Sequence, residues 1–262
     1  MVVAPAFVDC HSHVVPSGDD GAKTLAEGLR LCELAADTGT EVLYGTPHVW
    51  PHLVLTPERE AAILDAFERL RERAPLELRL GYELTPSRAL LDEDPARYVL
   101  EGTRVVLVEV PFSGPADELL ALGEHIEVAG LVPFVAHPER TQAVQERPAL
   151  ALELADRGWP LQVNATSLLG LHRPGAEALG WRLVEGGQAK AVASDGHRAT
   201  RPARLDDAYA LVVARVGEEA ALPLFDGSVL RYPAHKALAC DADIEATPAS
   251  PAGPSNAPSR LR

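Results

Sequence analysis

The stretch that decides the fold lies near the start of the chain and reads Phe7-Val8-Asp9-Cys10-His11-Ser12-His13. Its apolar lead-in over residues 2–8 predicts a buried strand, and alternation along that strand places His11 and His13 on one face. Two imidazoles at this spacing can bind one metal ion, because neutral imidazole is the commonest metal ligand. The acidic turn that follows adds the Asp20 carboxylate as an oxygen ligand. Without further context the motif fits two ordinary surface histidines equally well.

Length and composition favour one large α/β domain in the cytoplasm. The chain has 262 residues, a length at which α/β barrels commonly form a single domain. Hydrophobic residues make up 47% and aromatic residues only 5%, so aliphatic side chains must fill the core. No apolar run approaches the roughly 20 residues that span a bilayer, and the N-terminus lacks the basic region of a signal peptide. The net charge of −14 argues against binding nucleic acid or an anionic membrane surface, because both need a positive field.

The three cysteines, Cys10, Cys32 and Cys240, offer no covalent chemistry. They form no Cys-x-x-Cys pair, which argues against disulfides and against a cysteine zinc site. None is followed by arginine six positions later, so the loop of the cysteine-nucleophile phosphatases is absent. Walker, Gly-x-Gly-x-x-Gly and Gly-x-Ser-x-Gly motifs are absent as well, which leaves nucleotide-cofactor and serine-hydrolase functions without support.

Strand and helix patterns alternate along the chain. Apolar runs predict strands over residues 2–8, 41–45, 76–81, 104–108, 131–136, 160–163 and 189–193. Helical spacing follows most of them, from about 25 to 38, from 56 to 70, and near 117–129, 147–157, 176–185 and 205–216. Residues 84–102 fit neither pattern. Seven strand–helix units in series predict a parallel sheet that closes, or nearly closes, into a barrel.

The last stretch of sequence, residues 241–262, differs from the rest in composition. It is dense in Ala, Pro and Ser, with acidic residues at its start and arginine at its end. Such a segment cannot bury much apolar surface, so it predicts a disordered tail. We therefore expect a single domain over residues 1–240 followed by this tail.

Polar residues follow six of the seven predicted strands, at the point where each strand ends. The ends of parallel strands in a barrel converge on one mouth, where active sites are built. The residues in question supply five imidazoles and, with the Asp20 turn, four carboxylates: His11, His13, Asp20, His48, Glu83, Glu109, His137, Asp195 and His197. We predict that these nine side chains bind metal.

Nine ligands exceed what one ion can use, since a catalytic zinc ion takes about three from the protein. They suit two or three divalent ions, with a carboxylate such as Glu83 bridging a pair. A nitrogen and oxygen set without sulfur favours manganese, iron or zinc over calcium or magnesium. Three such ions would outweigh the charge of four carboxylates, so the filled pocket would be locally cationic and suited to a phosphate dianion.

Other interpretations of single residues remain open. Any one of the histidines could belong to the surface or the core, but Glu109 lies inside an apolar strand, where carboxylates are rare unless they are paired or bound to metal. His52 and His172 have no partner pattern, so we expect surface residues there. Arg140 and Arg201 follow predicted ligands closely and can grip phosphate oxygens in bidentate fashion. Their alternative role is that of solvated or ion-paired arginines.

The motifs taken together resemble the polymerase-and-histidinol-phosphatase (PHP) superfamily. The resemblance is carried by Asp9-Cys10-His11-Ser12-His13, Thr46-Pro47-His48, Ala136-His137-Pro138-Glu139-Arg140 and Ala193-Ser194-Asp195-Gly196-His197. Within the superfamily, the chain is similar to the bacterial manganese-dependent phosphotyrosine phosphatases of capsule and exopolysaccharide operons. Three features indicate this branch: Gly18-Asp19-Asp20-Gly21-Ala22-Lys23, Gly81-Tyr82-Glu83-Leu84, and the stretch from Gln162 to Gly170.

The resemblance implies a distorted (β/α)7 barrel with a three-metal centre, most often loaded with Mn²⁺. It also implies phosphate contacts from Arg140 and an arginine such as Arg201, and a phosphotyrosine protein as substrate, with the tail of a bacterial tyrosine kinase as the partner. The family often has a second histidine after Thr-Pro-His, where this chain has Val49. His48 is the member of that pair expected to bind metal, so the difference leaves the predicted centre complete.

Our hypothesis is hydrolysis of a phosphomonoester by a metal-bridging hydroxide that attacks phosphorus in line. A phenol, with a pKa of about 10, leaves more easily than an alkoxide, which favours aryl phosphates at a site without an evident general acid. The alternatives are a histidinol-phosphate-type phosphatase, a 3′–5′ exonuclease and a catalytically silent metal-binding module. The acidic surface argues against the exonuclease, and nine filled ligand positions argue against the silent module.

Overall fold

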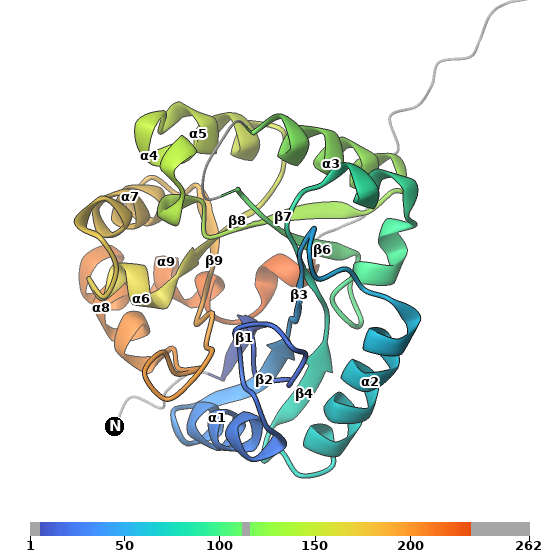
Figure 1. The fold of residues 1–262 in the computed structure, drawn as a ribbon. Coiled ribbons are helices and arrows are strands. Elements are labelled where there is room, and N and C mark those ends of the chain that lie inside the picture. The colour runs from blue at the N-terminus through green and yellow to red at the C-terminus, as the bar shows by residue number, and fades with distance from the viewer. Residues whose placement is uncertain (1–5, 112–115, 232–262) are drawn as a thin grey trace, which may run out of the picture.

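The computed structural model describes residues 6–111 and 116–231, and all strand pairs within them are parallel. One sheet has the order β1 (Phe7–Ser12), β2 (Thr40–Gly45) and β4 (Glu77–Leu80). The other has the order β3 (His48–Val49), β5 (Glu83–Leu84), β6 (Val105–Glu109), β7 (Val132–Ala136), β8 (Leu161–Asn164) and β9 (Ala189–Ala193). Figure 1 shows these strands in the middle of the molecule with helices around them. The predicted parallel α/β fold is confirmed.

Two short strands, β3 and β5, were not predicted, and each follows a predicted strand after a two-residue interruption. Residues 46–47 separate β2 from β3, and residues 81–82 separate β4 from β5. Pro47 lacks the N–H that a continuous ladder would use. Gly81 lies against Leu100, where an added Cβ would come within 2.3 Å of Leu100 Cδ2. The two segments are interrupted at the same level of the sheet, and the hydrogen bond from Glu83 N to Pro47 O (3.1 Å) keeps them side by side.

The two outer strands of this arrangement, β1 and β9, approach each other where they end. Asp195 N donates to His11 O (2.9 Å), and His13 N donates to Gly196 O (2.7 Å). The ends of the first and last strands are thus joined by backbone hydrogen bonds, as the barrel prediction requires of its mouth. All predicted ligands near these ends are thereby brought toward one another.

The first two helices begin where the sequence provides caps. Thr24 caps α1 (Leu25–Asp37) by accepting from Glu27 N, and Thr56 caps α2 (Pro57–Arg71) by accepting from Arg59 N. Pro57 occupies the first turn of α2, as predicted. The other long helices are α3 (Asp117–Val128), α5 (Ala149–Asp156), α7 (Pro174–Glu185) and α8 (Asp206–Val216). They pack on the outer side of the strands in Figure 1.

Short helices account for most differences from the predicted pattern. Pro148 disfavours helical geometry at Arg147, so α4 (Gln142–Glu146) ends there and α5 starts at residue 149 instead of 147. Two 3₁₀ turns lie in the segment that fitted neither pattern, η1 (Arg88–Asp92) and η2 (Pro95–Tyr98). The remaining short elements are η3 (Pro138–Arg140), α6 (Ala165–Leu168), α9 (Glu218–Ala221), η4 (Leu222–Leu224) and η5 (Ser228–Arg231).

The core is mainly aliphatic, as expected from the composition. All five residues of β6 and all five of β7 are buried. Trp159 is 1% exposed and packs against Gly123 of α3, where an added Cβ would lie 2.0 Å from the indole. In the part of the chain described, no helix is long and apolar enough to cross a membrane. The predicted tail over 241–262 lies outside the described residues, as does Cys240.

Candidate metal centre

The nine predicted ligands lie together at the C-terminal ends of the strands. They come from β1 and the turn after it, from the starts of β3 and β5, from the end of β6, and from the residues that follow β7 and β9. Eight of them are buried, and the ninth, Asp20, has a side chain that is 50% exposed. Side chains that lie far apart in the sequence therefore line one pocket, and their role as metal ligands remains a prediction.

Glu83 lies in the middle of this cluster. Its Oε2 atom is 3.1 Å from Nε2 of His11, 3.2 Å from Nε2 of His13 and 3.0 Å from Nδ1 of His48. Its other oxygen, Oε1, is 2.8 Å from Nε2 of His137. The pairing of β3 with β5 sets His48 directly opposite Glu83. One carboxylate thus contacts four imidazoles, which is the position that a bridging ligand would occupy.

Asp195 forms a second point of convergence. Its Oδ1 atom lies 3.5 Å from Nε2 of His11, 3.4 Å from Nε2 of His13 and 3.4 Å from Nδ1 of His197. Asp195 and His137 have φ values of 51° and 32°, the two positive values among the described residues other than glycine. Left-handed backbone is costly for such residues and clusters at functional sites. In both cases it turns the side chain inward just after a strand ends.

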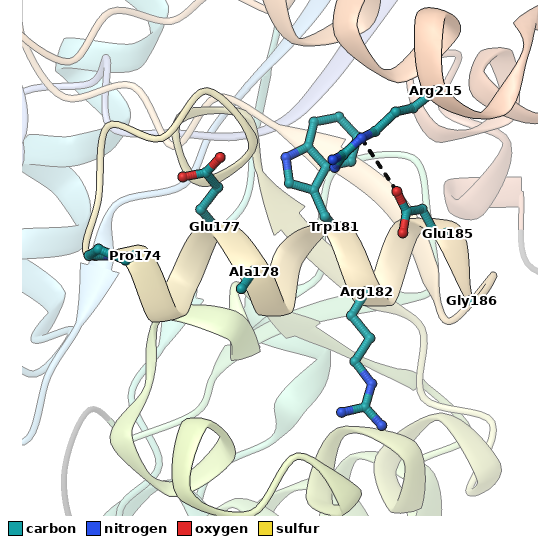
Figure 2. A pocket seen from close by; sticks show the side chains of 8 residues that line it. All are labelled: Pro174, Glu177, Ala178, Trp181, Arg182, Glu185, Gly186 and Arg215. Carbon is teal, nitrogen blue, oxygen red and sulfur yellow. Dashed lines mark ion pairs between the residues drawn. The ribbon is translucent and has the colours of Figure 1, made fainter.

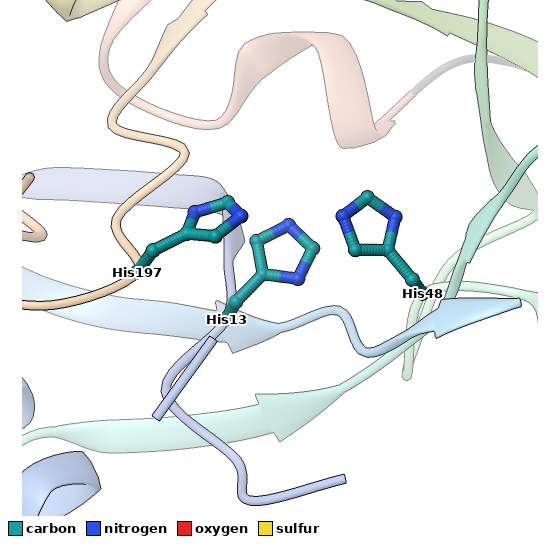
Figure 3. Close-up of side chains that lie close together, drawn as sticks. All are labelled: His13, His48 and His197. Atoms are coloured by element: carbon teal, nitrogen blue, oxygen red, sulfur yellow. The ribbon is translucent and has the colours of Figure 1, made fainter. Parts of the chain in front are cut away.

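The cluster contains four overlapping sets of three residues, and within each set the ligand atoms lie within 4.8 Å of one another. Figure 3 shows the set His13, His48 and His197, whose rings come from three separate segments and point into one space. The other sets are His11 with His137 and Asp195, His11 with His13 and Glu83, and Glu83 with Glu109 and His137. Because the sets share members, they fit adjacent ions better than a single one.

Two buried carboxylate oxygens indicate whether these residues suit a cation. Glu83 Oε2 and Asp195 Oδ1 are buried and, among the described residues, have no hydrogen-bond partner. A buried charged oxygen without a partner is costly, and a divalent ion would offset that cost. The imidazole nitrogens surround these oxygens without the geometry of hydrogen bonds, as ligands around a common centre would. The residues present therefore fit a metal cluster.

Electrostatics within the cluster show the same demand for positive charge. Burial disfavours the charged form of Glu83, but the charges of His11 and His48 hold its pKa well below the usual range. Burial, and next the charge of Glu83, raises the pKa of Glu109 to about 8. Burial disfavours the charged form of His13, but the nearby carboxylates of Asp19, Asp195 and Glu83 raise its pKa well above the usual value. Without metal, protons on His13 and Glu109 thus partly offset the negative charge of the buried carboxylates.

Strand β8 carries no predicted ligand, but two of its side chains orient predicted ligands on other strands. Gln162 Oε1 accepts from His11 Nδ1 (3.0 Å), which leaves His11 Nε2 as the ligand atom. Gln162 Nε2 donates to Asn164 Oδ1 (2.7 Å), and Asn164 Nδ2 donates to Asp195 Oδ2 (2.6 Å). Partners of this kind fix the tautomer and direction of metal ligands. Sequence reasoning missed Gln162, although it lies in a stretch that carried the family resemblance.

Three other residues missed by sequence reasoning also support the cluster. Asp19 Oδ2 accepts from His48 N (3.0 Å) and lies 3.5 Å from His13 Nδ1. Thr85 donates to Glu109. Asp9 accepts from Ser194 N (3.0 Å) and so ties β1 to the residues after β9. Asp9 and Asp19 stand inside the quoted motifs, whereas nothing in the sequence marks Thr85.

Both predicted phosphate-binding arginines reach the cluster. Arg140 Nη1 lies 2.7 Å from Asp195 Oδ2, and Arg201 contacts the same oxygen. Their side chains are 17% and 21% exposed, so both can meet a ligand from the solvent side. They line a cavity of about 180 Å³ together with Asp20, His48, Trp50, Glu109, His137, Asp195 and His197. Trp50 was not predicted to lie here.

The two histidines expected at the surface differ from each other. His52 is exposed, as predicted. His172 is partly exposed, so it also lies at the surface. Its Nε2 lies 2.8 Å from Thr166 Oγ1, and burial, followed by the charge of Arg140, lowers its pKa to about 4. The turn after α6 brings it toward the arginine side of the centre.

A larger cavity of about 730 Å³ lies on the outer side of α7. Figure 2 shows its lining, in which Arg215 pairs with Glu185 (3.4 Å) and lies over the Trp181 ring at 4.2 Å. None of the nine predicted ligands lines it. Its charged side chains do not converge on a point, so the candidate functional site is the cluster at the strand ends.

A parallel α/β fold whose strand ends gather imidazoles and carboxylates into overlapping sets is typical of metal-dependent hydrolases. The chain belongs to the CpsB/CapC family of capsular polysaccharide synthesis, whose sequence model matches residues 7–228. The predicted family resemblance is confirmed.

Curated relatives carry the same assignment. The chain is 28% identical over 221 residues to the tyrosine-protein phosphatase YwqE of Bacillus subtilis, covering 81% of this chain and 86% of YwqE. It is 28% identical over 233 residues to the tyrosine-protein phosphatase CpsB of Streptococcus agalactiae, covering 84% of this chain and 95% of CpsB. The identity to the putative tyrosine-protein phosphatase CapC of Staphylococcus aureus is 26%, covering 78% of this chain and 82% of CapC.

Solved structures agree with these relatives. One, from work on YwqE of Bacillus subtilis and CpsB of Streptococcus pneumoniae as unique metal-dependent tyrosine phosphatases, superposes with a TM-score of 0.75. The identity is 27%, and the match covers 83% of this chain and 90% of that one. Dihydropyrimidinase from Brevibacillus agri matches with a TM-score of 0.58 at 13% identity, over 86% of this chain and 70% of that one, which shows a shared fold alone.

Proposed function

We propose that this chain is a metal-dependent protein-tyrosine phosphatase that hydrolyses phosphotyrosine in proteins and acts in capsule or exopolysaccharide synthesis. The observation that carries the proposal is Glu83, whose two oxygens contact four imidazoles at one pocket in a chain of the CpsB/CapC family. Its curated relatives are tyrosine-protein phosphatases. We also propose that the phosphatase domain spans residues 1–240 and that residues 241–262 form a tail outside it.

The nine residues would hold two or three divalent ions, with Mn²⁺ the ion we propose and iron or zinc as alternatives. Bound ions of this kind supply an activated water and neutralise charge on a phosphoryl group. Glu83 lies between the imidazole sets, so it is the residue that would bridge two ions. Gln162 and Asn164 hold His11 and Asp195 in the orientation that binding requires.

Arg140 and Arg201 are the residues we propose for binding the substrate phosphate. Both contact Asp195 Oδ2 in this structure. A phosphate dianion at the mouth of the cavity would accept hydrogen bonds from the N–H groups of both guanidinium groups. They would orient the phosphoryl group and neutralise charge that develops on its oxygens. The proposal needs no strong general acid, because a phenolate of pKa about 10 is a better leaving group than an alkoxide.

The proposed substrate is a phosphotyrosine protein, with the tail of a bacterial tyrosine kinase as the partner and the cytoplasm as the location. Partner and location rest on the family resemblance. An acidic chain with a net charge of −14 gives no support to nucleic acid as a substrate.

The deciding experiment combines metal analysis of the purified protein with turnover of a phosphotyrosine peptide in added Mn²⁺, histidinol phosphate and single-stranded DNA serving as competing substrates. We expect bound metal and a clear preference for the peptide. Arg140→Ala should keep the metal and lose about 10²–10³-fold in activity, the loss expected for one electrostatic contact to the reacting group. Preference for histidinol phosphate, or a wild-type protein that binds metal without turnover, would refute the proposal.

A further inference from the structure

An aromatic stack leads from the metal centre to the outside of the molecule. The ring of Trp50 lies 4.3 Å from that of His48 at an angle of 27°, and 5.2 Å from that of His52 at an angle of 20°. Trp50 also lines the cavity that six of the predicted ligands and both arginines line. It is partly exposed there, while His52 is exposed. The stack therefore forms an aromatic wall on one side of the mouth.

The short hairpin over residues 48–53, which carries this wall, is held by hydrogen bonds. Trp50 pairs with Leu53 in an antiparallel bridge, with Leu53 N donating to Trp50 O (2.9 Å). Arg59 of α2 donates to three backbone carbonyls around the hairpin, those of Ser17 (3.1 Å), Leu53 (2.9 Å) and His48 (2.8 Å). A single guanidinium thus fixes both ends of the hairpin. The indole is preorganised, which lowers the entropic cost of using it for binding.

The remaining lining of the cavity is polar or charged. Besides Trp50 it consists of carboxylates, imidazoles and the two arginines, so Trp50 supplies its one apolar ring within the described residues. The other two tryptophans, Trp159 and Trp181, are buried elsewhere at 1% and 8% exposure. An indole at the mouth contributes nothing to binding metal ions. It can, however, contact a substrate that carries an aromatic ring next to its phosphate.

We propose that Trp50 is a specificity-determining residue that contacts the phenyl ring of phosphotyrosine and so selects aryl over alkyl phosphates; this inference rests on the proposed function. With the phosphate held by Arg140 and Arg201, the ring of the substrate leaves the cavity along the wall that Trp50 forms. Aromatic pairs prefer offset-stacked or edge-to-face contact, and either arrangement can form at the exposed part of the indole.

The test compares two non-hydrolysable ligands, phenylphosphonate and methylphosphonate, by calorimetry on the metal-loaded full chain. Wild type should prefer the phenyl compound, and Trp50→Ala should reduce that preference about fivefold to twentyfold, with Trp50→Phe restoring much of it. In parallel, kcat/KM for phosphotyrosine should fall by a similar factor in Trp50→Ala, with most of the change in KM, while turnover of phosphoserine stays within about twofold.

Three controls separate the ring contact from damage to the site. Val54→Ala changes an exposed residue beside the hairpin and should leave both affinities unchanged. Metal content and inhibition by inorganic phosphate should be the same in Trp50→Ala as in wild type, which shows that His48 keeps its place. Equal losses for phenyl and methyl ligands, or loss of metal, would overturn the inference. A wild type without phosphotyrosine turnover would instead refute the proposed function, whatever the phosphonate preference.

Discussion

Replacing Arg59 should destabilise the fold and loosen the metal centre together. Its guanidinium donates to the carbonyls of Ser17, His48 and Leu53, so it joins the acidic turn, the start of β3 and the hairpin. Hydrogen bonds from charged groups contribute about 1.5–3 kcal/mol each, but Arg59 is partly exposed and water can replace some of them. We therefore expect Arg59→Ala to lower the free energy of unfolding by about 2–3 kcal/mol.

The assay is urea unfolding with a chelator present, so that metal binding does not mask the loss. The corresponding drop in Tm is about 5–10 °C for a domain of this size. Arg59→Lys keeps the charge with fewer donors and should recover part of the stability. Arg69→Ala on the same helix removes an arginine that is 60% exposed and pairs with Asp65 (3.3 Å), so it should cost about 0–0.5 kcal/mol.

A second measurement tests the link to the centre. Because Arg59 fixes the backbone next to Asp20 and His48, Arg59→Ala should also weaken metal retention during dialysis, while Arg69→Ala should not. If Arg59→Ala unfolds within about 0.5 kcal/mol of wild type, or keeps metal as tightly, the hairpin is held by other contacts and the reasoning fails.

Three further predictions concern the cluster. Glu83→Gln should lose most of its bound metal, as elemental analysis would show, and retention of a full complement would exclude the bridging role. Gln162→Leu should lower metal affinity about 10–100-fold in a competitive chelator titration, with the fold intact by circular dichroism. Gly196→Ala should destabilise the protein by at least about 2 kcal/mol in urea, because its Cβ would lie 2.5 Å from Ala203 Cα; a Tm equal to wild type would contradict it.

The sequence was sufficient for the parallel strands and for the gathering of ligands. Parallel strands bring their C-terminal ends to one edge, so residues as distant as His11 and Asp195 could be assigned to one pocket from strand patterns alone. The short strands β3 and β5, which follow the interruptions at residues 46–47 and 81–82, were not predicted, because each depends on contacts across the sheet. The Leu100 side chain that fills the space beside Gly81, for example, belongs to a separate segment of the chain.

The supporting residues were harder to predict than the ligands. Gln162 and Thr85 have ordinary roles in most proteins, and only their neighbours in space, His11 and Glu109, give them a function here. Trp50 carries no motif, and its place at the mouth depends on the Arg59 contacts to its hairpin. The contact between His172 and Thr166 could not be predicted for the same reason, since the turn after α6 brings the two side chains together.

The way the ligand sets overlap has a consequence for how this centre responds to change. Glu83 belongs to two of the four sets, and so do His11, His13 and His137. Loss of any of these residues removes a ligand from two adjacent positions at once, so single substitutions cannot be assigned to single ions. Substitutions at such neighbouring positions are expected to be strongly non-additive. The double variant of Glu83 and His11 should therefore retain little less metal than Glu83→Gln alone, because the first change already disrupts the one set that contains both residues.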